Sequence, residues 1–260
     1  MTAPVLEVKD LSKNFGGLRA LNEVDMRVDK GEIAALIGPN GAGKTTFFNC
    51  VTGIYTPTSG EIFLYNPEKT LLNGKKPNVI TSLGMARTFQ NIRLFGEMTV
   101  LENVMIGRHC RTHAGIFGAI LRDKKTRLEE QETIDDSYAL LETVNLQEVW
   151  NEKARNLAYG AQRRLEIARA LATEPTLLLL DEPAAGMNPQ ETIELEELVR
   201  KIRDERDISI LLIEHDMGLV MSLSDRIYVM EYGGCIAEGT PEEIRSNPAV
   251  IKAYLGEEDA

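Results

Sequence analysis

The sequence predicts an α/β protein with a parallel sheet at its core, and three observations support this prediction. An apolar run at residues 32–37 indicates a buried strand, which leads through a glycine-rich turn into a helical pattern at residues 44–52. A second apolar run, at residues 176–182, contains four consecutive leucines and suits a strand buried on both faces of a parallel sheet. Residues 91–156 have helical periodicity, so we expect a helical lobe inserted into the sheet domain.

Length and composition fit an ordinary soluble globular protein. The chain has 260 residues, of which 43% are hydrophobic and 27% are charged. The formal net charge of −11 argues against a nucleic-acid surface, which needs a basic stripe. No apolar run approaches the about 20 residues of a membrane-spanning helix, and the N-terminus lacks the features of a signal peptide, so we expect a cytoplasmic chain. Cys50, Cys110 and Cys235 have no metal-ligand spacing, and we expect buried free thiols.

The N-terminal region predicts two strands, at residues 5–8 and 24–28. Between them lies the tetrapeptide Asn14-Phe15-Gly16-Gly17. Phe15 could stack on an adenine ring, because aromatic faces hold bases by their π-surface. Packing beneath the first sheet is an equally good interpretation, so the sequence leaves the role of Phe15 open.

The glycine-rich turn fits the phosphate-binding pattern G-x-x-x-x-G-K-[ST]. Its residues are Gly38, Pro39, Asn40, Gly41, Ala42, Gly43, Lys44, Thr45 and Thr46. The glycines let successive backbone N–H groups point at one anion, and a helix that begins near Gly43 adds the positive end of its dipole. We expect the Lys44 ammonium to lie between the β- and γ-phosphates of a nucleotide and the Thr45 hydroxyl to ligate Mg²⁺.

The next stretch of chain predicts strands at residues 60–65 and 85–89, with a surface loop at residues 71–78 because of Asn73-Gly74 and Pro77. The pattern becomes helical after Gln90. Thr99 and Glu102 form a capping box that opens a helix, and residues 124–144 are charged with apolar residues at helical spacing. The apolar run at residues 114–121 could be a docking surface for another protein, but the core of the lobe is the default for a run this short.

The second half of the sheet begins at residues 176–182 and ends in Asp181 and Glu182, two carboxylates that suit Mg²⁺ and water chemistry. Asn188, followed by Pro189, caps the next helix. A buried strand at residues 208–213 leads into Glu214-His215-Asp216. The remaining elements are a pair of strands at residues 226–231 and 235–238, a helix opened by the capping box at 240–243, and a last helix at 248–255.

Several segments, in matching order and spacing from residue 5 to residue 228, resemble ATP-binding cassette (ABC) proteins. Residues 157–171 resemble the signature segment, and residues 178–183 resemble the Walker B strand with its catalytic glutamate. Gln90 is similar to the glutamine of the Q-loop, residues 185–188 to the D-loop, and His215 to the switch histidine. The resemblance implies one ABC ATP-binding domain over residues 1–260, with a P-loop NTPase parallel-sheet core and an N-terminal antiparallel β subdomain in residues 1–90 and 161–260, and an inserted helical subdomain in residues 91–160.

The resemblance also implies roles for individual residues. ATP binds on the phosphate loop, and Mg²⁺ is held by Thr45, Gln90 and Asp181. Lys44 and the metal neutralise the developing phosphate charge, while Glu182 orients and deprotonates the attacking water. His215 contacts the γ-phosphate and that water. Gly160 belongs to the signature, which closes over the ATP of a second cassette.

Finer features resemble the ATPase subunits of branched-chain amino-acid importers. They are residues 14–18, 87–90, 157–160 and 253–256 and the long insertion after Arg108. ATPases of urea uptake and of lipopolysaccharide export share parts of these features, so both remain alternatives. A soluble cassette ATPase acting on ribosomes or DNA is disfavoured by the single cassette, the acidic charge and the lack of a long heptad run.

The signature and D-loop depart from the usual pattern. Ala158, Tyr159 and Ala161 replace a serine, a glycine and a glutamine, and Asn188 replaces an aspartate. One loop and one signature per chain imply a partner cassette, and these departures favour a heterodimer over a homodimer. The family further implies transmembrane permease subunits, indirectly a solute-binding protein, and a peripheral position at the cytoplasmic face of the inner (cell) membrane. The sequence does not give the solute.

Overall fold

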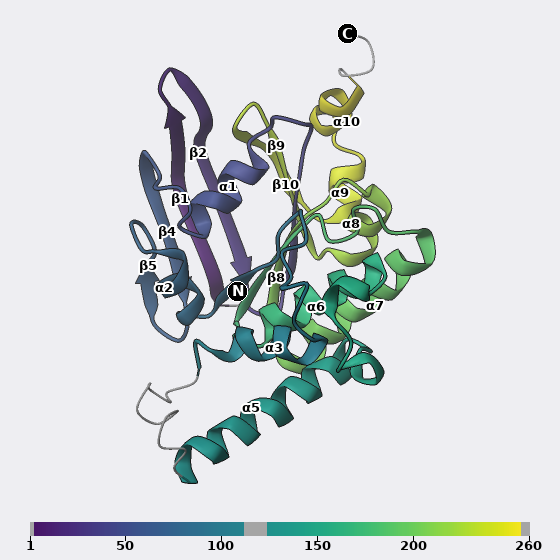
Figure 1. Cartoon of the computed structure of the whole chain (residues 1–260). Coiled ribbons are helices and arrows are strands. Elements are labelled where there is room, and N and C mark those ends of the chain that lie inside the picture. Colours follow the sequence, from purple (N-terminus) through teal and green to yellow (C-terminus); the bar gives the residue numbers. More distant parts are fainter. Residues whose placement is uncertain (1–2, 112–123, 256–260) are drawn as a thin grey trace.

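The strands of the computed structural model, which describes residues 3–111 and 124–255, form two sheets (Figure 1). The first is antiparallel and has the strand order β2-β1-β4-β5. The second has the order β10-β9-β3-β8-β7-β6, and its neighbours are parallel except for the β9–β10 hairpin. The predicted α/β fold, with a mainly parallel core and an antiparallel N-terminal sheet, is therefore confirmed.

The elements occur in the predicted order, but the first two strands extend well beyond the predicted residues 5–8 and 24–28, and the strand predicted at residues 85–89 ends at Arg87. The strands are β1 (Pro4–Phe15), β2 (Leu18–Asp29), β3 (Ile33–Ile37), β4 (Ser59–Tyr65), β5 (Lys69–Leu71), β6 (Met85–Arg87), β7 (Leu177–Asp181), β8 (Ser209–Ile213), β9 (Arg226–Glu231) and β10 (Gly234–Gly239). The helices are α1 (Lys44–Val51), α2 (Pro77–Ser82), α3 (Val100–Arg108), α5 (Lys124–Thr143), α6 (Tyr159–Leu171), α7 (Pro189–Arg206), α8 (Met217–Leu223), α9 (Pro241–Arg245) and α10 (Pro248–Leu255), with short 3-10 helices at Gln147–Val149 and Ala154–Asn156. None of the helices in the described part of the chain is long and apolar enough to cross a membrane.

The central strands β3, β7 and β8 determine where the candidate site residues lie. Every residue of these strands is buried, as expected for parallel strands covered on both faces. Leu36 of β3 and Asp181 of β7 both pair with Ile213 of β8, so the three strands end at the same edge. The segments that follow them are the glycine-rich loop, Glu182 and His215, and they therefore emerge together.

Side-chain caps begin three of the helices as predicted. Thr99 and Glu102 form a capping box at α3, Asn188 and Glu191 at α7, and Thr240 and Glu243 at α9. Helix α1 is different, because its N-cap is Gly43 with φ of 104° and no side-chain hydrogen bond. The first N–H groups of α1 are thus left for a ligand rather than for the chain's own side chains.

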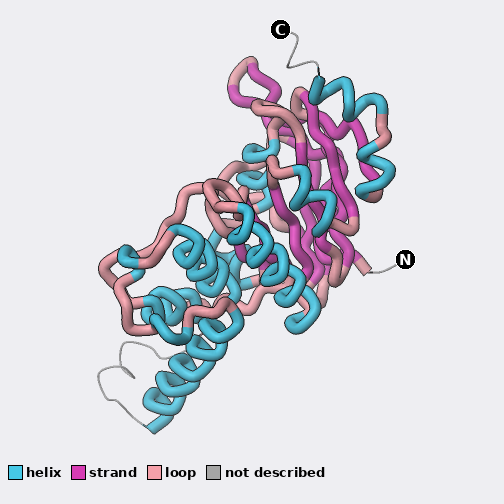
Figure 2. Tube along the Cα trace, turned by 90° about the vertical axis from the view of Figure 1, so that its right-hand side faces the viewer, coloured by secondary structure: helices cyan, strands magenta, loops and turns pink. Residues whose placement is uncertain are grey.

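Helices α3, α5 and α6 form a lobe beside the sheets. In Figure 2, a group of helices lies at the lower left, and the strands lie at the upper right with further helices against them. Its apolar residues, such as Val104, Leu141 and Leu165, belong to the same buried cluster as Leu178 of the parallel sheet. Helix α6 crosses position 160, where the sequence placed the end of the helical subdomain. The lobe therefore shares a core with the sheet through α6.

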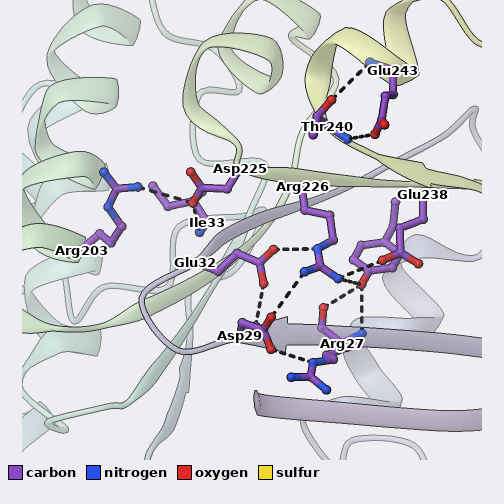
Figure 3. A network of polar contacts seen from close by, with 11 residues as sticks. Arg27, Asp29, Glu32, Ile33, Arg203, Asp225, Arg226, Glu238, Thr240 and Glu243 are labelled. Atoms are coloured by element: carbon purple, nitrogen blue, oxygen red, sulfur yellow. Dashed lines mark hydrogen bonds and ion pairs between the residues drawn. The ribbon is translucent and has the colours of Figure 1, made fainter. Parts of the chain in front are cut away.

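A polar network joins the two sheets (Figure 3). It lies at the start of β9, which is at the opposite end of the strands from the glycine-rich loop. Arg226, at the start of β9, donates from Nε to Glu32 Oε1 at 2.8 Å and from Nη1 to Glu238 Oε1 at 2.9 Å. Its Nη2 also lies 3.4 Å from Asp29 Oδ2, at the end of β2 in the antiparallel sheet. One guanidinium thus links β2, β9 and β10, which fixes the antiparallel sheet against the parallel core.

Two predictions about local structure are wrong. Residues 71–78 are not one loop, because Leu71 ends β5 and Pro77 begins α2, where proline is tolerated at the first helical position. The expectation of buried thiols holds for Cys50 alone, where burial raises the pKa of the thiol to about 11, whereas Cys110 and Cys235 are exposed. The apolar run at residues 114–121 lies outside the described residues.

Candidate nucleotide-binding site

The glycine-rich loop curls between β3 and α1 in a conformation that only small residues allow. Gly38 has φ of 147°, and a Cβ there would lie 2.1 Å from the carbonyl oxygen of Met230. Gly43 has φ of 104°, and a Cβ there would lie 2.7 Å from the carbonyl oxygen of Ala20. Both positions therefore need glycine for backbone conformation and for space. The result is a tightly curled loop held between β9 and β2.

Lys44 lies over this loop with its ammonium turned back toward the backbone. Its side chain is 6% exposed, and Nζ donates to the carbonyl oxygens of Gly38 and of Pro39, the latter at 3.0 Å. The lysine thus supports the loop and holds its charge where phosphate oxygens would approach. The adjacent Thr45 side chain is exposed.

A cavity of about 550 Å³ collects most of the predicted site residues from distant parts of the sequence. The predicted residues that line it are Phe15, Asn40, Gly41, Ala42, Gly43, Lys44, Thr45, Thr46, Gln90, Glu182 and His215. Leu18, Arg19, Ala20, Tyr232 and Gly233 also line it, and sequence reasoning missed them. The turn dipeptide Tyr232-Gly233 between β9 and β10 was visible in the sequence, but its proximity to the loop depends on the tertiary fold.

Glu182 is the central group at the end of the sheet where β3, β7 and β8 stop. It follows β7 with φ of 49°, an unfavourable value for a residue with a side chain, and its N–H donates to the carbonyl oxygen of Ile213 at 2.9 Å. Gln90 Nε2 donates to Glu182 Oε2 at 2.7 Å, and His215 Nε2 lies 2.8 Å from Glu182 Oε1. The Glu182 carboxylate therefore lies between the side chains of Gln90 and His215, to which the family resemblance assigns roles in the same hydrolysis reaction.

Asp181 lies beneath this edge, in an ion pair that the sequence did not predict. It is 4% exposed, and Arg87 Nη2 donates to its Oδ2 at 2.7 Å. Arg87 Nη1 also donates to Asn49 Oδ1 at 2.7 Å and to Thr52 Oγ1 at 3.2 Å, both on or just after α1. Arg87 thereby connects the helix after the loop to Asp181 at the end of β7. An arginine at the end of a buried strand was the signal available in the sequence.

Glu214 is a further residue that sequence reasoning did not use. It is 4% exposed and accepts hydrogen bonds from the backbone N–H of Ala184 at 2.7 Å and of His215 at 3.0 Å. Burial raises the pKa of its carboxyl, while the N–H groups act in the opposite direction. Glu214 fixes the segment after Glu182 against the segment that carries His215.

Phe15 lies at the rim of the cavity. Its side chain is 42% exposed, its ring meets that of Tyr55 edge-on at 5.2 Å, and Lys13 Nζ lies 5.0 Å from its centroid. Phe15 therefore does not pack beneath the sheet, which was the alternative interpretation. Phe15 lines the same cavity as the loop.

Gly160 does not line this cavity. It lies in the first turn of α6, buried against α7, where a Cβ would lie 2.6 Å from Glu191 Oε1. Ala158 is the N-cap of α6 and supplies no side-chain hydrogen bond. The signature turn is thus separate from the chain's own loop, and the structure does not bring Gly160 together with the other predicted site residues.

Comparison with known families fits this geometry. The chain belongs to the ABC transporter family, because the family model described as ABC transporter matches residues 21–185. A second family model, described as branched-chain amino acid ATP-binding cassette transporter, matches residues 235–260. The resemblance inferred from the motifs is therefore confirmed.

Relatives match over nearly the full length. The chain is 52% identical over 257 residues to the high-affinity branched-chain amino acid transport ATP-binding protein LivG of Salmonella typhimurium, covering 99% of this chain and 100% of that protein. It is 51% identical over 257 residues to the protein of the same description, BraF, of Pseudomonas aeruginosa, with the same coverage. Among solved structures, the ADP conformation of MJ1267, an ATP-binding cassette of an ABC transporter, superposes with a TM-score of 0.85 at 33% identity and covers 98% of this chain and 100% of that one.

Proposed function

We propose that this chain is the ATP-hydrolysing subunit of an importer of branched-chain amino acids. The observation that carries the proposal is the cavity that combines the phosphate loop with Gln90, Glu182 and His215. The amino-acid specificity is supported by the descriptions of the full-length relatives and by the second family model at the C-terminus. Uptake of urea and export of lipopolysaccharide remain the alternatives for the solute.

In the proposed reaction, the triphosphate of ATP lies on the N–H groups of the loop and at the start of α1. Lys44 stabilises the charge that develops on the transferred phosphoryl group. Glu182 orients the attacking water and accepts its proton, and Gln90 and His215 hold the Glu182 carboxylate in place. His215 also contacts the γ-phosphate once ATP is bound.

The residues proposed for Mg²⁺ have suitable chemistry. Thr45, Gln90 and Asp181 offer hydroxyl, amide and carboxylate oxygens, the donor types that Mg²⁺ prefers together with substrate phosphates. When bound with ATP, the ion would supply positive charge that offsets the charge developing on the phosphates.

Phe15→Ala is expected to weaken ATP binding by about 1–3 kcal/mol, the usual loss for one stacked aromatic ring. The reason is that Phe15 lines the cavity that holds the loop and is 42% exposed. Titration with a fluorescent ATP analogue checks this, with inorganic triphosphate as the control ligand because it has no base. Unchanged ATP affinity would mean that Phe15 only packs against Tyr55.

We further propose that the signature turn at Gly160 completes the ATP site of a second cassette. Its separation from the chain's own loop supports this role, since one chain cannot close its own site. The Asn188 side chain is engaged as the cap of α7, where its Oδ1 accepts from the Glu191 N–H at 3.0 Å. A related cassette with a full signature is the favoured partner, with a homodimer as the alternative.

The purified chain is expected to be slow alone and roughly tenfold faster with its paralogous cassette. Ala158 and Ala161 remove one or two hydrogen bonds of about 0.5–1.5 kcal/mol each from the signature, and 1.36 kcal/mol corresponds to tenfold in rate. The test is ATPase activity of the chain alone and mixed with the partner. The double variant A158S/A161Q should raise the activity of the chain alone. If the chain alone matches the mixture, or if the variant changes nothing, the proposed asymmetry is wrong.

Attachment to the membrane is proposed to occur through the helical lobe, which would bind permease subunits at the cytoplasmic face of the inner membrane. A solute-binding protein would act indirectly, on the other side of the permeases. The proposed contact is the surface near Gln90, where the lobe meets the core. Phe117, in the apolar run that could take part, lies outside the described residues. Co-purification of the chain with co-expressed permeases tests this attachment directly.

A further inference from the structure

The Q-loop segment depends on α6 for its backbone hydrogen bonds. Residues 88–93 form neither helix nor strand, so their carbonyl groups need partners from elsewhere. Arg163 supplies two of these partners, because its Nη1 donates to the carbonyl oxygen of Phe89 at 2.7 Å and its Nη2 donates to that of Gln90. Arg169 Nη1 donates to the carbonyl oxygen of Arg93 at 2.6 Å. Helix α6 thus holds both ends of the segment.

The Arg163 end of these contacts is buried and charged. The Arg163 side chain is 3% exposed and that of Glu166 is 2% exposed, and the two meet at 3.4 Å. Glu166 also accepts from the Phe89 N–H at 3.4 Å. Hydrogen bonds from a buried guanidinium to carbonyl oxygens are directional and lose little to solvent. A shift of the Gln90 backbone is therefore difficult without a shift of α6.

The same arginine reaches the first turn of α6. Arg163 Nη2 donates to the Tyr159 hydroxyl at 2.9 Å, and the Tyr159 ring lies against Gly186, where a Cβ would approach it to 3.3 Å. Gly160, the signature residue, is the next residue after Tyr159 in this turn. The backbone of Gln90 thus contacts Arg163, whereas the side chain of Gln90 contacts Glu182. One guanidinium therefore connects the residue that touches the catalytic carboxylate to the turn that would face the partner's ATP.

We propose that Arg163 is a positioning residue that ties the backbone of Gln90 to the signature turn of the same chain, with the Tyr159 hydroxyl as its second anchor. Movement of Gln90 toward a bound nucleotide then carries the signature turn with it, so that the site on the chain's own loop and the site completed by Gly160 change together. This inference rests on the proposed role of Gln90 at the nucleotide.

Arg163→Lys tests this positioning role. Lysine keeps the positive charge beside Glu166, but its single ammonium cannot reach the carbonyl oxygens of residues 89 and 90 and the Tyr159 hydroxyl together. We expect the affinity for a fluorescent ATP analogue to stay within about twofold and kcat to fall at least about tenfold, because a misplaced catalytic group costs rate rather than binding. Arg108→Lys is the matched control. Arg108 is a mostly buried arginine of the same lobe that pairs with Asp136 and Glu174 and has no contact with residues 89–93 among its described partners.

A double-mutant cycle separates positioning from general damage to the structure. If Arg163 acts through Gln90, adding Arg163→Lys to Gln90→Ala should lower kcat by less than about twofold, whereas independent effects multiply. Tyr159→Phe, which keeps the ring, is the second variant and should lower kcat about two- to tenfold with ATP affinity unchanged.

The remaining outcomes count against the inference. Multiplicative effects in the cycle, unchanged kcat in both Arg163→Lys and Tyr159→Phe, or a parallel loss of ATP affinity and melting temperature would each overturn it. If the natural chain binds and hydrolyses ATP and both variants keep a normal kcat, only the proposed link through Arg163 is overturned. A natural chain that neither binds nor hydrolyses ATP overturns the proposed function as well.

Discussion

Glu182→Gln is expected to bind ATP normally and to hydrolyse it about 10²–10⁴-fold more slowly, the usual contribution of a general base. Glutamine has the same shape as glutamate, so the contacts from Gln90 and His215 to position 182 can be kept in part, whereas the proton acceptor is lost. The phosphate loop and Asp181 are untouched by the change. Binding of a fluorescent ATP analogue and release of inorganic phosphate measure the two effects separately.

Glu61→Gln is the matched control for this variant. Glu61 is an exposed carboxylate on β4, outside the cavity, so the same chemical change there should leave both binding and hydrolysis unaltered. Near-normal turnover of Glu182→Gln would contradict its role as the base. Loss of ATP binding together with turnover would instead indicate that the carboxylate organises the site rather than activating water.

Lys44→Met is expected to weaken ATP binding by about 2–5 kcal/mol, which is roughly 30- to 5,000-fold, because it removes one partner of a buried charge interaction. The loss has two sources. The phosphates lose a cation, and the carbonyl oxygens of Gly38 and Pro39 lose the ammonium that holds the loop. Calorimetric titration with ATP measures the change.

An exposed lysine provides the comparison. Lys201 on α7 is exposed and lies outside the cavity, so Lys201→Met should leave ATP affinity unchanged. Thermal unfolding of both variants shows whether the fold is intact. An intact Lys44→Met variant with ordinary ATP affinity would contradict the assignment of the cavity as the nucleotide site.

Most of the fold could be predicted because its signals are local. The strand–loop–helix at residues 33–51, the leucine strand β7 and the three capping boxes each depend on neighbouring residues alone. The short helix α2 was missed because Asn73-Gly74 and Pro77 are turn formers as well as helix boundaries. The exposure of Cys110 and Cys235 depends on tertiary packing, which spacing does not reveal.

The candidate site likewise contains some residues that the sequence predicts and others that it does not. The phosphate loop, Asp181, Glu182 and His215 follow buried strands, and parallel strands bring such residues to one edge. The partners of these residues lie far away in the sequence. Arg87 meets Asp181 across 94 positions, and Arg163 meets Gln90 across 73. Contacts between residues this far apart in the chain leave no periodic pattern in the sequence, so they could not be predicted from it.

The most direct test of the account is uptake by the complete importer. Liposomes containing the permeases, this chain and its partner cassette are loaded with ATP and given leucine together with a branched-chain amino-acid-binding protein. The account predicts leucine uptake that depends on internal ATP and falls about 10²–10⁴-fold when this chain carries Glu182→Gln. Uptake that is equally fast with that variant, or a complex that takes up urea and not leucine, would contradict it.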